Sequence, residues 1–212
     1  MSQKLLSSSK VIDVPCESER GPFRITSKTQ VYDNPWITVH EYQVITPAGT
    51  PGLYGVLSHK TRAACVLAVD PDGCLLLIRQ FRFQLNTMAL DIIQGGVPKG
   101  EALLGAAKRE LQEDAGMQAQ TWVELERFTS CNGIGDKTGG IFLAYGLQDN
   151  GQTCFDDEEE LELVKVPLQT AFDMARSGEI ADIASRAAIA RLEVMTLRGE
   201  LPSEFWILDQ DG

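Results

Sequence analysis

Residues 95–117 read GGVPKGEALLGAAKRELQEDAGM and contain a cluster of acidic side chains. Residues 102–115 include no proline and a single glycine, so their composition predicts a helix. On that helix Glu110 lies three residues before Glu113 and four before Asp114, which places the three carboxylates on one face. Like charges at this spacing repel each other unless a cation lies between them. Mg²⁺ prefers oxygen ligands and often combines one or two carboxylates with the phosphates of a substrate.

An acidic cluster alone does not establish a metal site, because exposed helix faces are commonly acidic for reasons of solvation. The spacing of the whole stretch favours the metal site. It resembles the Nudix box, G-x5-E-x7-R-E-U-x-E-E-x-G-U, where U is a bulky aliphatic residue. Asp114 stands where the family has Glu, and its side chain is one methylene shorter. The matching residues are Gly95, Glu101, Arg109, Glu110, Leu111, Glu113, Gly116 and Met117.

Several residues of the stretch have a physical role that follows from their type. Gly95 and Gly96 allow the backbone to approach a ligand closely. Arg109 is expected to be structural, pairing with Glu101 or another carboxylate of the box to hold loop and helix together. A buried stripe at helical spacing is expected from Leu103, Ala107 and Leu111.

The composition limits the classes of partner. The chain has 212 residues, a net charge of −11 and an isoelectric point near 4.6, which argues against nucleic acid and anionic membranes as partners. A phosphorylated substrate remains compatible, because a bound metal reverses the local charge. The five cysteines form no CxxC motif, and Cys65 and Cys74 lie in apolar runs, which predicts buried thiols in a cytoplasmic protein. No signal peptide, transmembrane run or zinc motif is visible.

The pattern along the chain predicts a small β-region followed by a mixed α/β domain. Residues 1–20 are expected to be loose or partner-dependent, and we divide the chain into an N-terminal β-region (1–58), a catalytic domain (59–198) and a tail (199–212). Residues 70–73, Asp-Pro-Asp-Gly, predict a hairpin turn. The expected strands are 30–32, 36–45, 53–58, 63–69, 74–80, 90–94, 120–129, 141–147 and 161–166, and the expected later helices are 168–176 and 184–197.

The resemblance extends beyond the box. Residues 79–82, Arg-Gln-Phe-Arg, resemble the R-Q-[YF]-R run of ADP-ribose pyrophosphatase-like Nudix members, and residues 178–182 resemble their G-x-I-x-D stretch. The resemblance implies an α/β (α+β) fold, a Nudix α/β/α sandwich with a mixed sheet, preceded by a small N-terminal antiparallel β-domain. It also implies a homodimer formed through that β-domain. Two departures are Asp91, where the family often has Glu, and Asn132, where a Pro marks ADP-ribose specificity.

The activity implied is Mg²⁺-dependent hydrolysis, with Mn²⁺ as a possible substitute, of the pyrophosphate bond in a nucleoside diphosphate sugar. ADP-ribose is the first candidate, and the products would be a nucleoside monophosphate and a sugar phosphate. Glu110, Asp114 and Glu113 are the expected metal ligands. Glu113 and Glu159 are the expected catalytic residues, with Glu158 and Glu160 as alternatives to Glu159.

The expected substrate-binding residues are Arg79, Arg82, Gly95, Gly96 and Trp36. For the two arginines a surface or interdomain ion pair is an equal alternative, and for Trp36 a place in the core is favoured over stacking on a nucleobase. Alternative functions are a non-catalytic sensor that binds a nucleotide sugar, or a hydrolase of GDP-mannose or another nucleoside diphosphate sugar.

Overall fold

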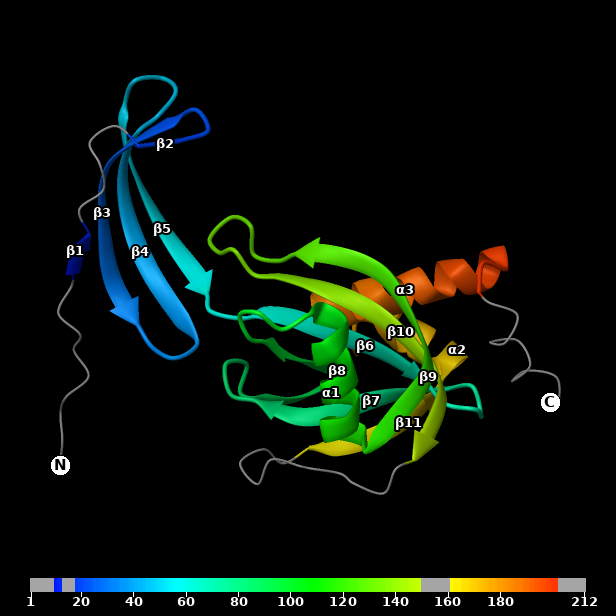
Figure 1. Cartoon of the computed structure of the whole chain (residues 1–212). Helices are drawn as coiled ribbons and strands as arrows, with labels where there is room; N and C mark the ends of the chain where they lie inside the picture. Colours follow the sequence, from blue (N-terminus) through cyan, green and yellow to red (C-terminus); the bar gives the residue numbers. More distant parts are fainter. Residues whose placement is uncertain (1–9, 13–17, 150–160, 202–212) are drawn as a thin grey trace, which may run out of the picture. The chain divides into compact units, whose positions relative to one another are not determined.

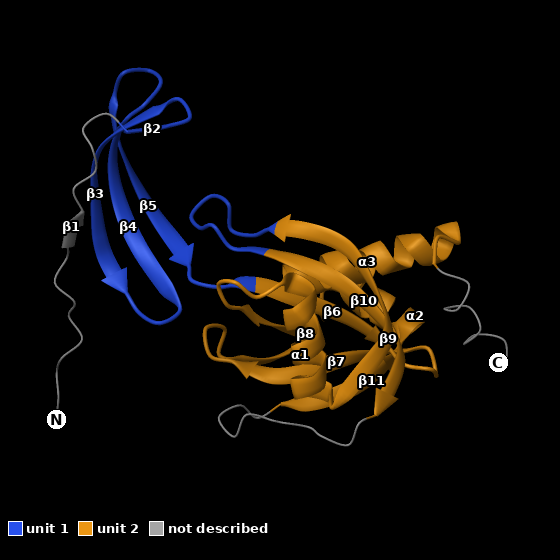
Figure 2. Ribbon diagram, viewed as in Figure 1, with its two compact units in different colours: residues 1–62, 129–138 blue, residues 63–128, 139–212 orange. Residues whose placement is uncertain are grey.

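The computed structural model describes residues 10–12, 18–149 and 161–201. The chain forms two compact units, coloured separately in Figure 2. Unit 1 comprises residues 1–62 together with the later segment 129–138, and unit 2 comprises residues 63–128 and 139–212.

Unit 1 is an antiparallel sheet with the strand order β1-β3-β4-β5, in which β2 also pairs with β3. The segment 129–138 joins this unit because the Leu57 amide donates to the Ile134 carbonyl (2.8 Å) and the Asp136 amide donates to the Leu57 carbonyl (3.3 Å). Within residues 1–20, which we expected to be loose or partner-dependent, two short strands pair with β3. The strands are β1 Lys10–Ile12, β2 Ser18–Arg20, β3 Phe23–Asp33, β4 Ile37–Ile45 and β5 Pro51–His59.

Trp36 lies outside the small core of unit 1, so the favoured core position was wrong. Its side chain is 70% exposed. The Asn34 carboxamide oxygen accepts hydrogen bonds from the backbone amides of Trp36 (2.9 Å) and Ile37 (2.7 Å), which fixes a turn before β4 begins. Trp36 is part of this turn, and the core is formed instead by Ile25, Tyr42 and Val44, with Phe23 and Val56 packed against them.

Unit 2 is built on a six-stranded sheet with the order β11-β7-β8-β6-β10-β9. Strands β6 and β10 run parallel, whereas β7 is antiparallel to β8 and to β11, so the sheet is mixed as expected. The strands are β6 Arg62–Val69, β7 Cys74–Arg82, β8 Thr87–Val97, β9 Met117–Thr129, β10 Thr138–Asp149 and β11 Glu162–Pro167.

The turn between β6 and β7 confirms the expected hairpin. The Asp70 carboxylate accepts from the amides of Asp72 (3.0 Å) and Cys74 (2.9 Å), and Gly73 takes a φ of 73°, which suits glycine. Lys165 on β11 donates to the same carboxylate (2.8 Å), and this contact explains how Asp70 can be almost fully buried.

Three helices cover the two faces of the unit 2 sheet: α1 Leu103–Ala115, α2 Leu168–Ser177 and α3 Ile183–Arg198. Alternate strand residues pack on opposite sides: Val66 and Leu76 belong to the cluster under α1, and Leu67 and Leu77 to the cluster under α2 and α3. Figure 1 shows α1 on one side of the sheet and α2 and α3 on the other. The expected α/β/α sandwich is confirmed.

The end of α3 corrects the expectation of a peripheral tail from residue 199. The Glu200 amide donates to the Met195 carbonyl (2.9 Å) after Gly199 adopts the left-handed conformation, so the chain turns back. Leu201 is then buried in the core beneath α2 and α3.

Of the two cysteines expected to be buried, Cys65 is buried and Cys74 is half-buried. None of the described helices is long and apolar enough to span a membrane.

Candidate active site

The end of strand β8, at Gly95, lies directly on the acidic face of α1. Glu110 sits in the middle of the buried side of the helix and is 8% exposed, beside Leu103, Ala106 and Leu111. A Cβ atom built on Gly95 would lie 1.9 Å from the Cδ atom of Glu110. The backbone of β8 therefore touches this carboxylate, and only glycine fits at position 95.

Arg109 on α1 contacts four groups, and these contacts hold the end of β8 and the following segment to the helix. Its Nη1 atom lies 2.7 Å from carboxylate oxygens of both Glu110 and Glu113. Its Nη2 atom donates to the Gly96 carbonyl (2.9 Å) and reaches the Glu101 carboxylate at 3.4 Å. Burial opposes the charge of Arg109, but the hydrogen bonds to Glu101 and Glu113 and the charge of Glu110 outweigh burial and raise the Arg109 pKa. The expected pairing with Glu101 is present.

Glu110 is a carboxylate kept away from water. Burial is the main cause that raises its pKa, the charges of Glu113 and Glu101 add to the rise, and Arg109 partly offsets it. A single guanidinium thus faces three carboxylates, and the local charge remains negative. Such a cluster of oxygen donors suits a hard divalent cation.

The residues fit a metal, although their side chains are turned elsewhere. In the described part of the chain no group of three His, Cys, Asp or Glu side chains is arranged to hold an ion. Arg109 explains this, because it draws Glu110 and Glu113 toward itself. Asp114 lies half-buried on the same helix, one turn after Glu110. Residues Glu110, Glu113 and Asp114 would hold a cation after the first two turn away from the arginine.

The two arginines of the 79–82 run both meet carboxylates. Arg79 Nη1 lies 3.4 Å from Glu162 on the neighbouring strand β11, and both side chains are exposed. Arg82 donates from Nε (3.0 Å) and Nη2 (2.5 Å) to one oxygen of Asp91, which is 3% exposed. Burial raises the pKa of Asp91, against the lowering effect of Arg82.

A second polar network joins α3 to β8, and sequence reasoning missed its central residue, Ser185. The Ser185 amide and hydroxyl both donate to the Asp182 carboxylate (2.8 and 2.9 Å), and the hydroxyl accepts from the Ile92 amide (3.2 Å). An Asp three residues before a Ser at the start of an apolar helical run is a recognisable capping signal. The partner strand, by contrast, is 93 residues away in the sequence.

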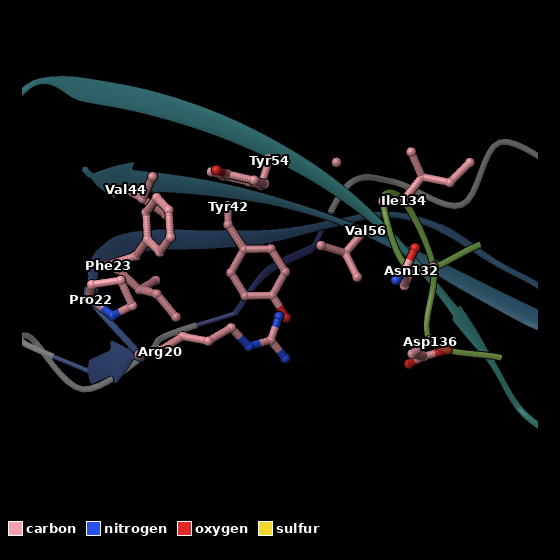
Figure 3. A pocket seen from close by; sticks show the side chains of 15 residues that line it. Arg20, Pro22, Phe23, Tyr42, Val44, Tyr54, Val56, Asn132, Ile134 and Asp136 are labelled. Atoms are coloured by element: carbon pink, nitrogen blue, oxygen red, sulfur yellow. The ribbon is translucent and has the colours of Figure 1, made fainter. Parts of the chain in front are cut away.

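The remaining predicted site residues are Glu159 and Trp36. Glu159 lies outside the described residues. Trp36 belongs to unit 1, whereas the box belongs to unit 2. Unit 1 has a cavity of its own of about 560 Å³ (Figure 3). Tyr42, Tyr54 and Phe23 line it from the sheet, and Asn132 and Asp136 line it from the 129–138 segment.

Comparison with known families identifies the class of protein. Residues 59–184 match the model of the NUDIX domain, and residues 23–57 match the N-terminal domain of nucleoside diphosphate sugar hydrolases. The chain belongs to the NUDIX domain family. The two matches together place the protein among the Nudix pyrophosphohydrolases, as the box predicted.

The individual relatives have low sequence identity to this chain, and each alignment covers most of both proteins. An ADP-ribose pyrophosphatase of Bacillus subtilis is 28% identical over 79% of this chain and 91% of its own. A methanol dehydrogenase activator of Bacillus methanolicus is 24% identical over 80% and 92%. The crystal structure of an ADP compounds hydrolase superposes with a TM-score of 0.73 at 19% identity, covering 94% of this chain and all of that one, which supports the fold.

Proposed function

We propose that the protein hydrolyses the pyrophosphate bond of a nucleoside diphosphate sugar, with ADP-ribose as the first candidate, to a nucleoside monophosphate and a sugar phosphate. The observation that carries the proposal is the contact of the Gly95 backbone with the buried Glu110 carboxylate, beside Glu113. A pyrophosphate bound along Gly95 and Gly96 at the end of β8 would lie next to the acidic residues. The relatives named for ADP-ribose support the choice of substrate.

Mg²⁺, which Mn²⁺ could replace, would neutralise the diphosphate and lower the pKa of the attacking water. Glu110, Glu113 and Asp114 would hold the ions. Arg109 would hold Glu113 in place relative to the end of β8, because it donates hydrogen bonds to both the Glu113 carboxylate and the Gly96 carbonyl. Glu113 and Glu159 are the proposed catalytic carboxylates, one of which would take the proton of the water.

The proposed substrate contacts are those expected from the sequence. Gly95 and Gly96 allow close approach of the diphosphate, and Arg79 and Arg82 would donate forked hydrogen bonds to it. Asp91 holds two nitrogens of Arg82 and so sets the orientation of its guanidinium. Trp36 is exposed enough to stack on a base.

A substrate panel tests the proposal. The protein would be incubated with ADP-ribose, GDP-mannose and UDP-glucose in the presence of Mg²⁺, and the products would be separated by ion-exchange chromatography. We expect ADP-ribose to be cleaved, and the Glu110→Gln variant to lose turnover because it removes a charged metal ligand. Glu124→Gln, the same change on an exposed strand position paired with Arg127, is the matched control and should retain turnover. Wild-type turnover in Glu110→Gln would refute the assignment.

A different nucleoside diphosphate sugar, GDP-mannose among them, is the second candidate. Asn132 favours it, because this residue stands at the position where a Pro marks ADP-ribose specificity, and it lines the cavity of unit 1. Faster cleavage of GDP-mannose than of ADP-ribose in the panel would select this candidate. Ligand binding without any product would instead select the sensor.

The homodimer implied by the resemblance is also a proposal. Unit 1 exposes several large apolar side chains on its strands and turns, among them Trp36, Leu53 and Tyr54. We expect Leu53→Glu to lower the mass measured by sedimentation velocity, while Thr50→Glu, at an exposed turn position, leaves it unchanged. An unchanged mass in both variants would contradict a dimer formed through this surface.

A further inference from the structure

Helix α3 carries two apolar faces, and only one of them is packed against the described part of its own chain. The inner face consists of Ala188, Ile189, Leu192 and Met195, all buried in the core beneath the sheet. On the opposite side a second set of apolar residues recurs at intervals of four, three, four and three. This outer stripe consists of Ile183, Ala187, Ala190, Val194 and Leu197, and all five are exposed.

The geometry of the stripe is that of a helix–helix seam. At 3.6 residues per turn its five members fall within about 80° of one another around the helix, directly opposite the inner face. The alternation of four and three is the spacing by which one helix presents a continuous apolar seam to another. Ile183 is 68% exposed and Leu197 is 80% exposed, so the two largest members lie open at the ends of the stripe.

The outer stripe of one copy can pack against the outer stripe of a second copy that runs in the opposite direction. When a second copy is laid antiparallel about a two-fold axis near Ala190, Ile183 faces Leu197 of the second copy and Ala187 faces Val194. Alanines at the centre allow two helices to approach closely, and the interaxial distance of packed helices falls toward 8 Å when the contacting side chains are small. The antiparallel arrangement also places each helix dipole against its opposite.

The charges beside the stripe agree with the same arrangement. Arg186 and Glu193 occupy one flank, and the two-fold axis places each Arg186 beside Glu193 of the second copy. Glu193 also contacts Arg176 of its own chain, so it faces two arginines in the pair. On the other flank Arg191 approaches its symmetry mate, and Glu126 of its own chain, 3.8 Å away, balances that charge.

We propose that the outer stripe of α3 is a self-association surface, on which α3 of a second copy packs antiparallel about Ala190. The seam is about 21 Å long, from Ile183 to Leu197 at a rise of 1.5 Å per residue. One helix of this length is small for a protein interface, so the association is reversible and depends on concentration. This contact is separate from unit 1 and does not rest on the proposed hydrolytic activity.

Disulfide trapping tests directly whether the α3 helices of two copies meet at Ala190. The full-length chain would carry Ala190→Cys in a background where Cys16, Cys131 and Cys154 are serine, and oxidation would be followed by non-reducing electrophoresis. A two-fold axis near residue 190 brings the two Cα atoms within the range of about 4.4–6.8 Å that a disulfide requires. We expect a covalent dimer from Ala190→Cys and none from Lys108→Cys, which places a thiol on the exposed side of α1.

A second pair of variants tests whether cross-linking depends on the packed stripe or arises from random collisions between molecules. Adding Leu197→Glu to Ala190→Cys should reduce the cross-linked fraction about tenfold, because a charge replaces a buried leucine at the end of the seam. Adding Leu104→Glu, an exposed leucine of α1, should leave it unchanged. Equal cross-linking in both would overturn the proposal.

A truncated protein that ends at Leu201 tests the other candidate for covering the outer stripe, which is residues 202–212 of the same chain. We expect the truncated Ala190→Cys protein to cross-link as readily as the full-length one. Cross-linking that appears only after truncation would show that residues 202–212 cover the stripe, and it would overturn pairing between copies.

Discussion

Gly95 and Glu110 show how one missing side chain shapes the site. The space that a Cβ atom would need at residue 95 is filled by the Glu110 carboxylate, with all three carboxyl atoms within 2.1 Å of that point. The glycine is therefore required by the close approach of β8 and α1. A methyl group at this position must displace either the carboxylate or the end of the strand.

We predict that Gly95→Ala lowers kcat by about 100-fold, since a displacement of about 1 Å in a catalytic group has an effect of that order. Overpacking should also destabilise the fold by about 1–3 kcal/mol. Initial rates on the cleaved substrate and urea unfolding measure the two effects. Gly105→Ala on α1 is the control, because its nearest neighbouring atom is 4.0 Å from the new Cβ. A fully active Gly95→Ala would contradict the claim that position 95 requires glycine.

Asp91 supplies a pH-dependent test at the same scale. Burial raises its folded-state pKa above the ordinary value of 3.8, so folding favours the protonated form. The stabilising contribution of Asp91 is therefore complete below its unfolded pKa and is lost as the pH rises through the folded pKa. Asn at this position cannot ionise.

We predict that the stability of wild type relative to Asp91→Asn falls as the pH rises from about 4, near the unfolded pKa of Asp, toward neutrality. Urea unfolding of both proteins across this range measures the difference. Asp72→Asn at the exposed hairpin turn is the control. A difference that stays constant or grows with pH would contradict a raised pKa at Asp91.

At the scale of elements, α3 is fixed to the sheet at its first turn. Asp182 caps the helix, and the Ser185 hydroxyl accepts a hydrogen bond from the Ile92 amide of β8, the strand that also carries Gly95 and Gly96. Ser185 is fully buried, so its removal leaves a buried amide without this partner.

We predict that Ser185→Ala destabilises the protein by about 1–3 kcal/mol, the cost of an unsatisfied buried donor. Chemical denaturation provides the measurement. Ser177→Ala, whose exposed hydroxyl bonds the Met174 carbonyl at the end of α2, should change stability by about 0.5 kcal/mol at most. Equal effects of the two substitutions would mean that the link to β8 contributes nothing.

At the scale of the whole molecule, the proposed binding of a cation among the α1 carboxylates would be linked to folding. The carboxylates crowd together only in the folded state, so Mg²⁺ would bind that state and stabilise it. At a tenfold excess of Mg²⁺ over its Kd the gain is about 1.4 kcal/mol. For a chain of this size the gain corresponds to a rise in Tm of about 3–6 °C.

We predict this rise in Tm for wild type and for Glu124→Gln, and its loss in Glu110→Gln. Differential scanning calorimetry in MgCl₂ and in EDTA, at constant ionic strength, measures it without any substrate. A rise that persists in Glu110→Gln would place the ion elsewhere in the molecule.

The amino-acid sequence determined every feature that depends on local spacing. The α1 helix with its buried stripe of Leu103, Ala107 and Leu111 follows from a period of 3.6 residues, and the hairpin at 70–73 follows from its turn residues. These two features are predictable because each is encoded within a few neighbouring residues. The pairing of Arg109 with Glu101 was accessible for the same reason, since both lie in one box. The α/β/α layering was expected from the resemblance to the Nudix family.

The tertiary structure decided which distant groups meet. It places Trp36 in the solvent and pairs Arg82 with Asp91, and it also joins Ser185 to Ile92. It assigns residues 129–138 to the same unit as the N-terminal strands. These outcomes depend on how sheets and helices pack across long sequence separations. Residue type alone cannot tell an arginine that meets a buried carboxylate from one that meets a phosphate, because both partners satisfy the same guanidinium.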